Sequence, residues 1–371
     1  MPAIAPGSKV LVTGATGFIG IWVTRTLLEK GYSVRGTVRS ASKGKYLTDY
    51  FKSYGEKFET AIVEDISKDG AFDEAVKGVD GIEHVASPFH LKADDPQELI
   101  GPAVNGTLGI LNSALRNNPT LKRVVITSSC AAVLEILPEP KVFSELDWNK
   151  QSVQQVEEQG KAASNITKYR ASKTLAERAA WEFYEKHKAE ITWDVVVINP
   201  PFVSRLAIHP RRPPTPLLQV FGPVIHEVAS RDTLNTSSSD LLKVLLTPST
   251  SPSAMSSETL TTTGSCWIDV RDLAEGHAKA LEVPDAGGER IIISAGPYVW
   301  QDWIDVAQGL SPPVALPAHQ KLAVGVPGGG KGAVHKIQYD TAKAGRILGM
   351  KYRSREDTIR AALEDVVTRG W

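Results

Sequence analysis

The chain has 371 residues, which is long enough for one large α/β domain or for a nucleotide-binding domain with a smaller lobe. Lysine and arginine number 42, as do aspartate and glutamate, so the zero formal net charge argues against a nucleic-acid or other polyanionic partner. Two cysteines are too few for a disulfide framework or a cysteine-rich metal site, and no apolar stretch reaches the ~20 residues that span a membrane. With no signal-peptide pattern in its first residues, the chain is expected to be cytoplasmic.

The first 39 residues contain a strand, a glycine turn, a helix and a second strand. An apolar run at 9–13 precedes three evenly spaced glycines, and helical apolar spacing at 19–28 leads to a second strand at 32–38. This order is typical of a dinucleotide-binding unit, in which a helix N-terminus attracts the pyrophosphate. The expected contacts with the cofactor in this motif are Gly14, Thr16, Gly17, Phe18, Ile19 and Gly20.

The end of the second strand indicates which cofactor is bound. NAD binders usually carry an acidic residue there, which binds the ribose 2′-hydroxyl, whereas this chain has Arg39 and then Lys43, with no acid before Asp49. A cation suits the 2′-phosphate of NADP. The pattern favours NADPH/NADP+, with a solvated strand-end charge as the alternative reading of Arg39.

Later strand ends of the same sheet supply further candidates. Asp65 and Ile66 follow a strand at 59–63 and could bind adenine, although Asp65 could equally cap a loop. Ligands of doubly wound sheets lie beyond the carboxyl ends of the strands. Val85, Ala86, Ser87 and Thr127 are therefore expected at the cofactor, and Phe89 at the substrate.

Helical and strand patterns continue along the chain, with a polar insertion at 138–159 and a change of composition after Pro200 and Pro201. The patterns predict a Rossmann doubly wound parallel sheet in residues 1–200. Residues 201–371 are expected to form mainly a smaller substrate-binding lobe, with some segments returning to the first domain. The remaining predicted helices are 45–54, 69–76, 96–117, 166–188, 271–281, 300–308, 340–348 and 355–369, and the remaining strands are 81–86, 122–127, 192–198, 266–270 and 290–294.

A serine, a tyrosine and a lysine form the candidate catalytic group. Tyr169 and Lys173 are four residues apart and therefore share a helix face, and Ser129 follows the fifth strand. An ammonium group favours the phenolate and so eases proton exchange with a phenol. We expect NADPH to deliver hydride to a carbonyl carbon, Tyr169 to protonate the oxygen, and Ser129 to orient it. Cys130 beside Ser129 is expected to be a packing residue.

Several motifs resemble those of the extended short-chain dehydrogenases/reductases. The chain is most similar to the dihydroflavonol-reductase-like group and its fungal aldehyde, ketone and methylglyoxal reductases. The matching stretches are TGATGFIG at 13–20, VRGTVRS at 34–40, HVASPF at 84–89, VNGTLGIL at 104–111, RVVITSS at 123–129, YRASK at 169–173, INPPFV at 198–203 and WIDVRDLAEGHAKAL at 267–281.

The resemblance implies roles for individual residues. It implies catalysis by Ser129, Tyr169 and Lys173, the last two of which also contact the cofactor, and further cofactor contacts from Arg39 and Lys43. It implies a nicotinamide loop at 200–203, with contacts from Pro200, Phe202 and Val203. It also implies substrate contacts from Phe89, Ser129, Val133, Leu134 and Tyr169. Residues 204–264 match the family poorly, which leaves the identity of the substrate open.

The expected function is NADPH-dependent reduction of small-molecule aldehydes or ketones by a monomer or homodimer, without a metal. Other reactions on the same scaffold stay open, namely those of a cinnamoyl-CoA-type reductase, a hydroxysteroid dehydrogenase or a sugar-nucleotide epimerase. A non-catalytic NADP-sensing protein is a further alternative, although the retained tyrosine and lysine argue against it.

Overall fold

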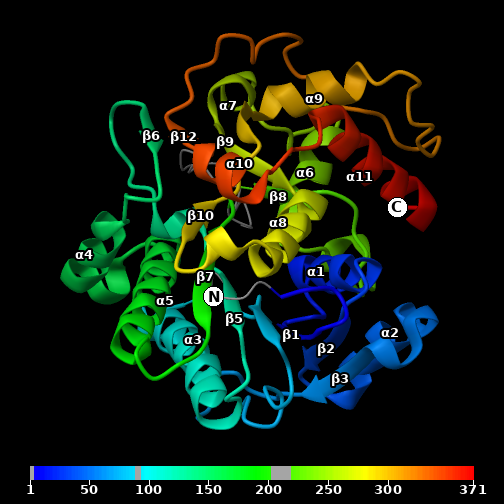
Figure 1. The fold of residues 1–371 in the computed structure, drawn as a ribbon. Coiled ribbons are helices and arrows are strands. Elements are labelled where there is room, and N and C mark those ends of the chain that lie inside the picture. The colour runs from blue at the N-terminus through cyan, green and yellow to red at the C-terminus, as the bar shows by residue number, and fades with distance from the viewer. Residues whose placement is uncertain (1–3, 88–92, 202–218) are drawn as a thin grey trace.

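A seven-stranded parallel sheet forms the centre of the computed structural model, which describes residues 4–87, 93–201 and 219–371 (Figure 1). The strands lie in the order β10-β7-β5-β4-β1-β2-β3. The strands β1, β5 and β7 are largely buried and rich in valine and isoleucine, as expected for strands that are covered on both faces, whereas the edge strand β3 is largely exposed. The bounds of the strands are Lys9–Thr13 (β1), Ser33–Val38 (β2), Phe58–Ile62 (β3), Gly81–His84 (β4), Arg123–Thr127 (β5), Asp194–Asn199 (β7) and Arg290–Ile292 (β10).

The strand order reverses at β1, which pairs with β2 on one side and with β4 on the other. The connections that leave β1 and β4 therefore diverge to opposite sides of the sheet, which opens a crevice at the carboxyl ends of these strands. The predicted Rossmann architecture is confirmed, and its ligand-binding edge is the one that carries the glycine turn.

Helices cover both faces of the sheet, with α3 and α5 on one face and α1 and α8 on the other (Figure 1). Apolar side chains of the strands alternate between the two resulting cores, so that Val10 and Val12 face one core and Leu11 faces the other. The bounds of these helices are Phe18–Glu29 (α1), Gln97–Asn117 (α3), Asn165–His187 (α5) and Val270–Glu282 (α8).

Two segments of the second half of the chain contribute to this central layer. Strand β10 pairs with β7 in parallel, and α8 packs against α1. A return of later segments to the sheet was expected, while the division of the chain at residue 200 stays a prediction.

Some of the remaining elements extend the central layer, since α2 (Ala41–Tyr50) packs against β2 and β3, and α4 (Lys150–Gln159) packs against α5. A second region surrounds a three-stranded sheet, β11-β9-β8, and a two-stranded ladder, β12-β6. An aromatic cluster that includes Phe221, Trp267, Tyr298 and Trp303 fills its core. The strands of the two small sheets are Lys141–Phe143 (β6), Gln219–Phe221 (β8), Gly264–Asp269 (β9), Gly296–Val299 (β11) and Ile337–Tyr339 (β12). The remaining helices of the described chain are Ala41–Tyr50 (α2), Lys150–Gln159 (α4), Thr236–Leu246 (α6), Ser257–Thr262 (α7), Trp300–Gln308 (α9), Ala342–Leu348 (α10) and Arg355–Arg369 (α11). The 3₁₀ turns are Lys52–Lys57 (η1), Cys130–Ala132 (η2), Gly160–Ala162 (η3), Arg231–Thr233 (η4) and Pro284–Ala286 (η5).

Local structure departs from the sequence predictions in three places. Residues 69–76 form successive turns and not a helix, and Gly70 adopts a positive φ of 70° that interrupts helical geometry. The polar insertion at 138–159 contains strand β6 and the full helix α4. Helix α6 forms in a segment rich in serine and threonine where no helix is predicted, because its leucines pack into the aromatic core.

Among the helices in the described part of the chain, none is both long enough and apolar enough to cross a membrane.

Candidate functional site

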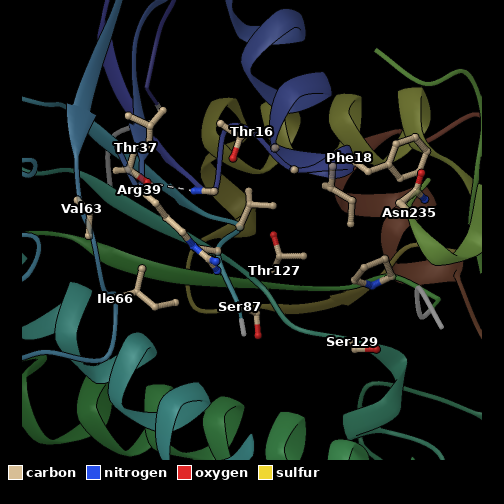
Figure 2. Close-up of a pocket in the computed structure, with 18 of the residues that line it drawn as sticks. Thr16, Phe18, Thr37, Arg39, Val63, Ile66, Ser87, Thr127, Ser129 and Asn235 are labelled. Carbon is tan, nitrogen blue, oxygen red and sulfur yellow. Dashed lines mark hydrogen bonds between the residues drawn. The ribbon is translucent and has the colours of Figure 1, made fainter. Parts of the chain in front are cut away.

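A cavity of about 510 Å³ lies along the carboxyl edge of the sheet (Figure 2). It brings together residues from the glycine turn, from the ends of β2, β3, β4, β5 and β7, and from helices α2 and α5. Most of the predicted cofactor residues are in its wall, namely Gly14, Thr16, Gly17, Phe18, Ile19, Gly20, Arg39, Lys43, Ile66, Val85, Ala86, Ser87, Thr127, Tyr169, Lys173 and Pro200.

The glycine turn is shaped by close approach of the backbone. Gly14 has a φ of 67°, and a Cβ atom on Gly20 would lie 2.2 Å from the Gly14 carbonyl oxygen. Gly17 caps α1 without a side-chain hydrogen bond, so the first N–H groups of the helix are left for a ligand. This combination forms an anion-binding helix N-terminus.

Hydrogen bonds between neighbouring strands fix the crevice beside this turn. The Thr13 hydroxyl accepts from the Ala86 amide at 3.0 Å and lies 3.0 Å from His84 Nδ1. The Gly14 amide donates to the Thr37 hydroxyl at 3.1 Å (Figure 2). The floor of the cavity is therefore held in place by the ends of β1, β2 and β4.

Two cations lie at one end of the cavity. Arg39 is exposed, points into the cavity and forms no ion pair with any described residue (Figure 2). Lys43 Nζ lies 3.4 Å from Glu227 Oε2, in a pair that is largely exposed to solvent and therefore weak. Cationic side chains, one of them without a carboxylate partner in the described part of the chain, suit an additional phosphate.

Asp65 and Ile66, which follow β3, lie in different surroundings. Ile66 lies in the cavity wall, whereas Asp65 does not. The Asp65 carboxylate accepts from the Ser67 amide at 2.9 Å and from its hydroxyl at 2.6 Å, and these bonds lower the pKa of Asp65. Asp65 is thus engaged in a local turn, which is the loop alternative that its sequence position left open.

Ser129, Tyr169 and Lys173 meet at the other end of the cavity. Ser129 follows β5 and caps the turn η2, where its Oγ accepts from the Ala131 amide at 3.0 Å. Tyr169 is buried in α5 and hydrogen-bonded to Ser129. Lys173 Nζ donates to the Ser87 hydroxyl at 2.8 Å and lies 5.9 Å from the centre of the Tyr169 ring.

Burial controls the ionisation of this group. It raises the pKa of Tyr169 well above its usual value, against the smaller lowering effect of the Ser129 hydrogen bond. It lowers the pKa of Lys173 to about 8, and Glu177 opposes that shift. We expected Lys173 to ease deprotonation of Tyr169, but desolvation dominates here and keeps the phenol protonated.

The predicted substrate residues are only partly brought to the cavity. Val133 and Leu134 are buried in the apolar cluster that also contains Cys130 and Phe143, and they do not line the cavity. Cys130 donates to the Asn199 carbonyl at 3.2 Å, as expected of a packing residue. Phe89, Phe202 and Val203 lie outside the described residues.

Sequence reasoning missed several wall residues: Thr37, Val38, Tyr46, Val63, Ser128, Glu227 and Asn235. Pro201 also lies in the wall, within the segment 200–203 that the family resemblance implies as the nicotinamide loop. Most of the missed residues are neighbours of predicted residues, which a wider window around each strand end would have included. Glu227 and Asn235 come from a distant segment that gave no local signal. Within the described ranges, no group of acidic, histidine and cysteine side chains could hold a metal ion.

Comparison with known proteins agrees with this geometry. Residues 10–201 match the model of the NAD dependent epimerase/dehydratase family. The chain belongs to this family. The matched residues include the glycine turn and the helix that carries Tyr169 and Lys173.

The relatives include several reductases. The chain is 34% identical over 375 residues to the ketoreductase azaE of Aspergillus niger, with 97% of this chain and 96% of the relative covered. It is 32% identical to the NADPH-dependent methylglyoxal reductase GRE2 of Saccharomyces cerevisiae, with 95% and 96% covered. The crystal structure of yeast methylglyoxal/isovaleraldehyde reductase Gre2 complexed with NADPH has a TM-score of 0.80 at 29% identity, with 98% and 99% covered.

Proposed function

We propose that this protein is an NADPH-dependent carbonyl reductase that converts aldehydes or ketones to alcohols. The observation that carries the proposal is the placement of two groups at opposite ends of one cavity. Phosphate-binding elements occupy one end, and the buried Ser129, Tyr169 and Lys173 occupy the other. Reductases among the relatives, several of them NADPH-dependent, support the same activity.

The residues present fit NADPH. The uncapped N-terminus of α1 suits the pyrophosphate, and Arg39, which has no carboxylate partner among the described residues, suits the 2′-phosphate. Ile66 and Val63 offer apolar surface near the same end, and Lys173 can bind ribose hydroxyls at the other. When bound, NADPH supplies the hydride that reduces the carbonyl carbon.

Side chains of this protein would bind the carbonyl oxygen of the substrate and protonate it. Ser129 Oγ would hold the carbonyl oxygen and stabilise the negative charge that develops there. Tyr169 would donate its phenolic proton to that oxygen, because burial keeps the phenol protonated until an alkoxide forms nearby. The positive charge of Lys173 would then stabilise the resulting phenolate. The buried apolar cluster to which Tyr169 belongs would limit the access of water to the proton.

The remaining expectations about this protein belong to the same proposal. We infer a cytoplasmic monomer or homodimer that acts on a small-molecule carbonyl compound. Its two cysteines are buried free thiols, as suits a reducing compartment. Size-exclusion chromatography with light scattering and fractionation of cells that produce the protein would test both statements.

Oxidation of NADPH and, separately, of NADH tests the activity directly. The substrate panel contains aldehydes, ketoesters, aryl ketones, a dihydroflavonol and a cinnamoyl thioester. We expect turnover of simple aldehydes or ketones with a clear preference for NADPH. Turnover of the thioester alone would move the assignment to a cinnamoyl-CoA-type reaction. Tight NADPH binding without turnover of any carbonyl would contradict the proposal in favour of a sensor.

A further inference from the structure

A buried carboxylate lies beside the candidate catalytic group. Glu177 is on α5, four residues beyond Lys173 and eight beyond Tyr169, so the three side chains share one face of the helix. Glu177 is 1% exposed. A carboxylate this deeply buried is costly unless hydrogen bonds and an opposite charge compensate it, so its partners indicate what it is for.

Each partner of Glu177 comes from a different strand of the sheet. Ser128 Oγ donates to Oε2 at 2.5 Å from the end of β5, and Asn199 Nδ2 donates to the same oxygen at 2.8 Å from the end of β7. Arg290 Nε donates to Oε1 from β10. One carboxylate therefore joins the carboxyl ends of β5 and β7 and the first residue of β10 to the helix that carries Tyr169 and Lys173.

The first two partners are sequence neighbours of site residues. Ser128 directly precedes Ser129, and Asn199 directly precedes Pro200 in the predicted nicotinamide loop. Asn199 Nδ2 also donates to the Ser129 carbonyl at 3.1 Å. A shift of the Glu177 carboxylate would therefore move Ser129 relative to Tyr169.

The third partner, Arg290, has further hydrogen bonds and a ring contact besides its bond to Glu177. Its guanidinium donates to the backbone carbonyls of Glu145, Asp147 and Ala132 and stacks 3.8 Å from the centre of the Trp148 ring. The ion pair with Glu177 is thus fully hydrogen-bonded, which is the condition under which a buried pair is tolerated.

Charge also connects Glu177 to Lys173. Burial lowers the pKa of Lys173, and Glu177 is the group that raises it again. The other titratable neighbours add little charge, because burial keeps His84 on β4 neutral and raises the pKa of Tyr169 on α5 and of Cys130 beside β5. Arg290 on β10 is the charged group that offsets Glu177.

We propose that Glu177 is a positioning residue for carbonyl reduction, which holds Ser129, the Asn199–Pro200 segment and Lys173 in register and sustains the positive charge of Lys173. This inference rests on the proposed function, because it concerns the same reaction. It assigns to Glu177 two separable effects. The hydrogen bonds align the reacting groups, and the negative charge sets the pH at which Lys173 loses its proton.

Glu177→Gln tests the charge, because glutamine preserves the volume and removes the negative charge. We expect kcat to fall about 10- to 100-fold with little change in KM for the carbonyl substrate. The loss of activity at alkaline pH should move lower by about one pH unit, since Lys173 deprotonates more easily beside a neutral amide and the remaining Arg290 charge. An unchanged kcat and an unchanged alkaline limb would overturn the proposal.

Glu177→Asp separates alignment from charge. It keeps the negative charge but is too short to reach all three strands, so we expect a lower kcat with the alkaline limb at its original pH. Ser128→Ala removes one hydrogen bond and should lower kcat about threefold to tenfold without moving the limb. If Glu177→Gln fails to fold, these two variants decide the matter, and an unchanged kcat in both would overturn it.

Asp194→Asn is the matched control. Asp194 is a buried carboxylate that pairs with Arg123 at the opposite edge of the same sheet. This control should lower Tm without changing kcat or the alkaline limb. A limb displaced equally in Asp194→Asn and Glu177→Gln would mean a merely structural role for Glu177.

A second readout separates failure of this inference from failure of the proposed function. Lys173 faces the cofactor cavity, so its deprotonation should weaken the binding of NADPH, which can be titrated without any carbonyl substrate. If the wild-type protein reduces no carbonyl compound, the proposed function fails. The pH dependence of NADPH affinity in Glu177→Gln would still decide whether Glu177 sustains the charge of Lys173.

Discussion

Two buried arginine–carboxylate pairs occupy opposite edges of the central sheet. At the amino ends of β5 and β7, the Arg123 guanidinium donates two hydrogen bonds to Asp194, at 2.6 and 2.9 Å. At the carboxyl ends of the same strands, Glu177 accepts a hydrogen bond from Arg290. The chemistry is the same, but the surroundings differ. Arg123 donates its other hydrogen bonds to backbone carbonyls at the end of α8 and just beyond it. Glu177 instead accepts from Ser128, which lines the cavity, and from Asn199, which directly precedes the lining residue Pro200.

We infer from this difference that position in a parallel sheet determines what each of these two buried ion pairs does. The Arg123 pair ties β5 and β7 to α8 and so secures the layer of helices. The Glu177 pair lies where ligands of doubly wound sheets bind, and its partners are adjacent in sequence to Ser129 and Pro200. We therefore expect loss of the first to affect stability and loss of the second to affect chemistry.

Arg123→Met provides the largest expected change in stability. It leaves Asp194 buried without its cation, which should lower the free energy of unfolding by about 3–5 kcal/mol. Urea unfolding measures this loss, and kcat per folded molecule should stay at the wild-type value. A large fall in kcat at undiminished stability would break the distinction between the two edges.

Arg39→Asp tests the cation end of the carboxyl edge. An aspartate there should repel the 2′-phosphate and accept from a ribose hydroxyl, which shifts the ratio of NADPH to NADH affinity about 10- to 100-fold toward NADH. Titration of both cofactors measures the ratio. Arg35→Gln is the control, because Arg35 lies on β2, which directly precedes Arg39, but pairs with Glu59 and does not line the cavity. Equal ratios in wild type and Arg39→Asp would remove Arg39 from the phosphate site.

His84 provides a smaller, pH-dependent effect at the same edge. Burial lowers the pKa of His84 to about 3, so below its ordinary pKa the unfolded chain binds a proton that the folded protein does not. Stability is therefore lost as pH falls, by about 2 kcal/mol between about pH 7.5 and about pH 5.

The variant His84→Gln removes this titration and keeps a hydrogen-bonding group near Thr13. Urea unfolding at the two pH values should show a shallower decline for the variant than for the wild type. Identical declines would mean that folding does not lower the pKa of His84.

The first half of the molecule could be predicted in detail because its signals are local. The glycine turn, the Tyr-Lys spacing and each strand end are encoded in contiguous residues, and parallel pairing brings the strand ends to one edge. These rules place Ser129, Tyr169 and Lys173 in one cavity without knowledge of any contact. Asp65 shows the limit, since a turn acid and a ligand-binding acid have the same sequence context.

The second half depends on contacts between distant segments, which periodicity does not report. Helix α6 forms in a stretch rich in serine and threonine because its leucines meet aromatic side chains from β9, β11 and α9. Glu227 and Asn235 reach the cavity from the same region. The sequence likewise does not indicate Glu177, because its proposed role depends on partners from three separate strands.

Tyr169→Phe tests the central claim most directly, with turnover and NADPH affinity measured on the same preparation. The phenylalanine keeps the buried ring and removes only the proton donor. The account predicts that NADPH binds within about twofold of the wild-type affinity while kcat falls about 10²- to 10⁴-fold. Turnover at the wild-type rate with intact NADPH binding would contradict the assignment of Tyr169 as the acid and with it the proposed reaction.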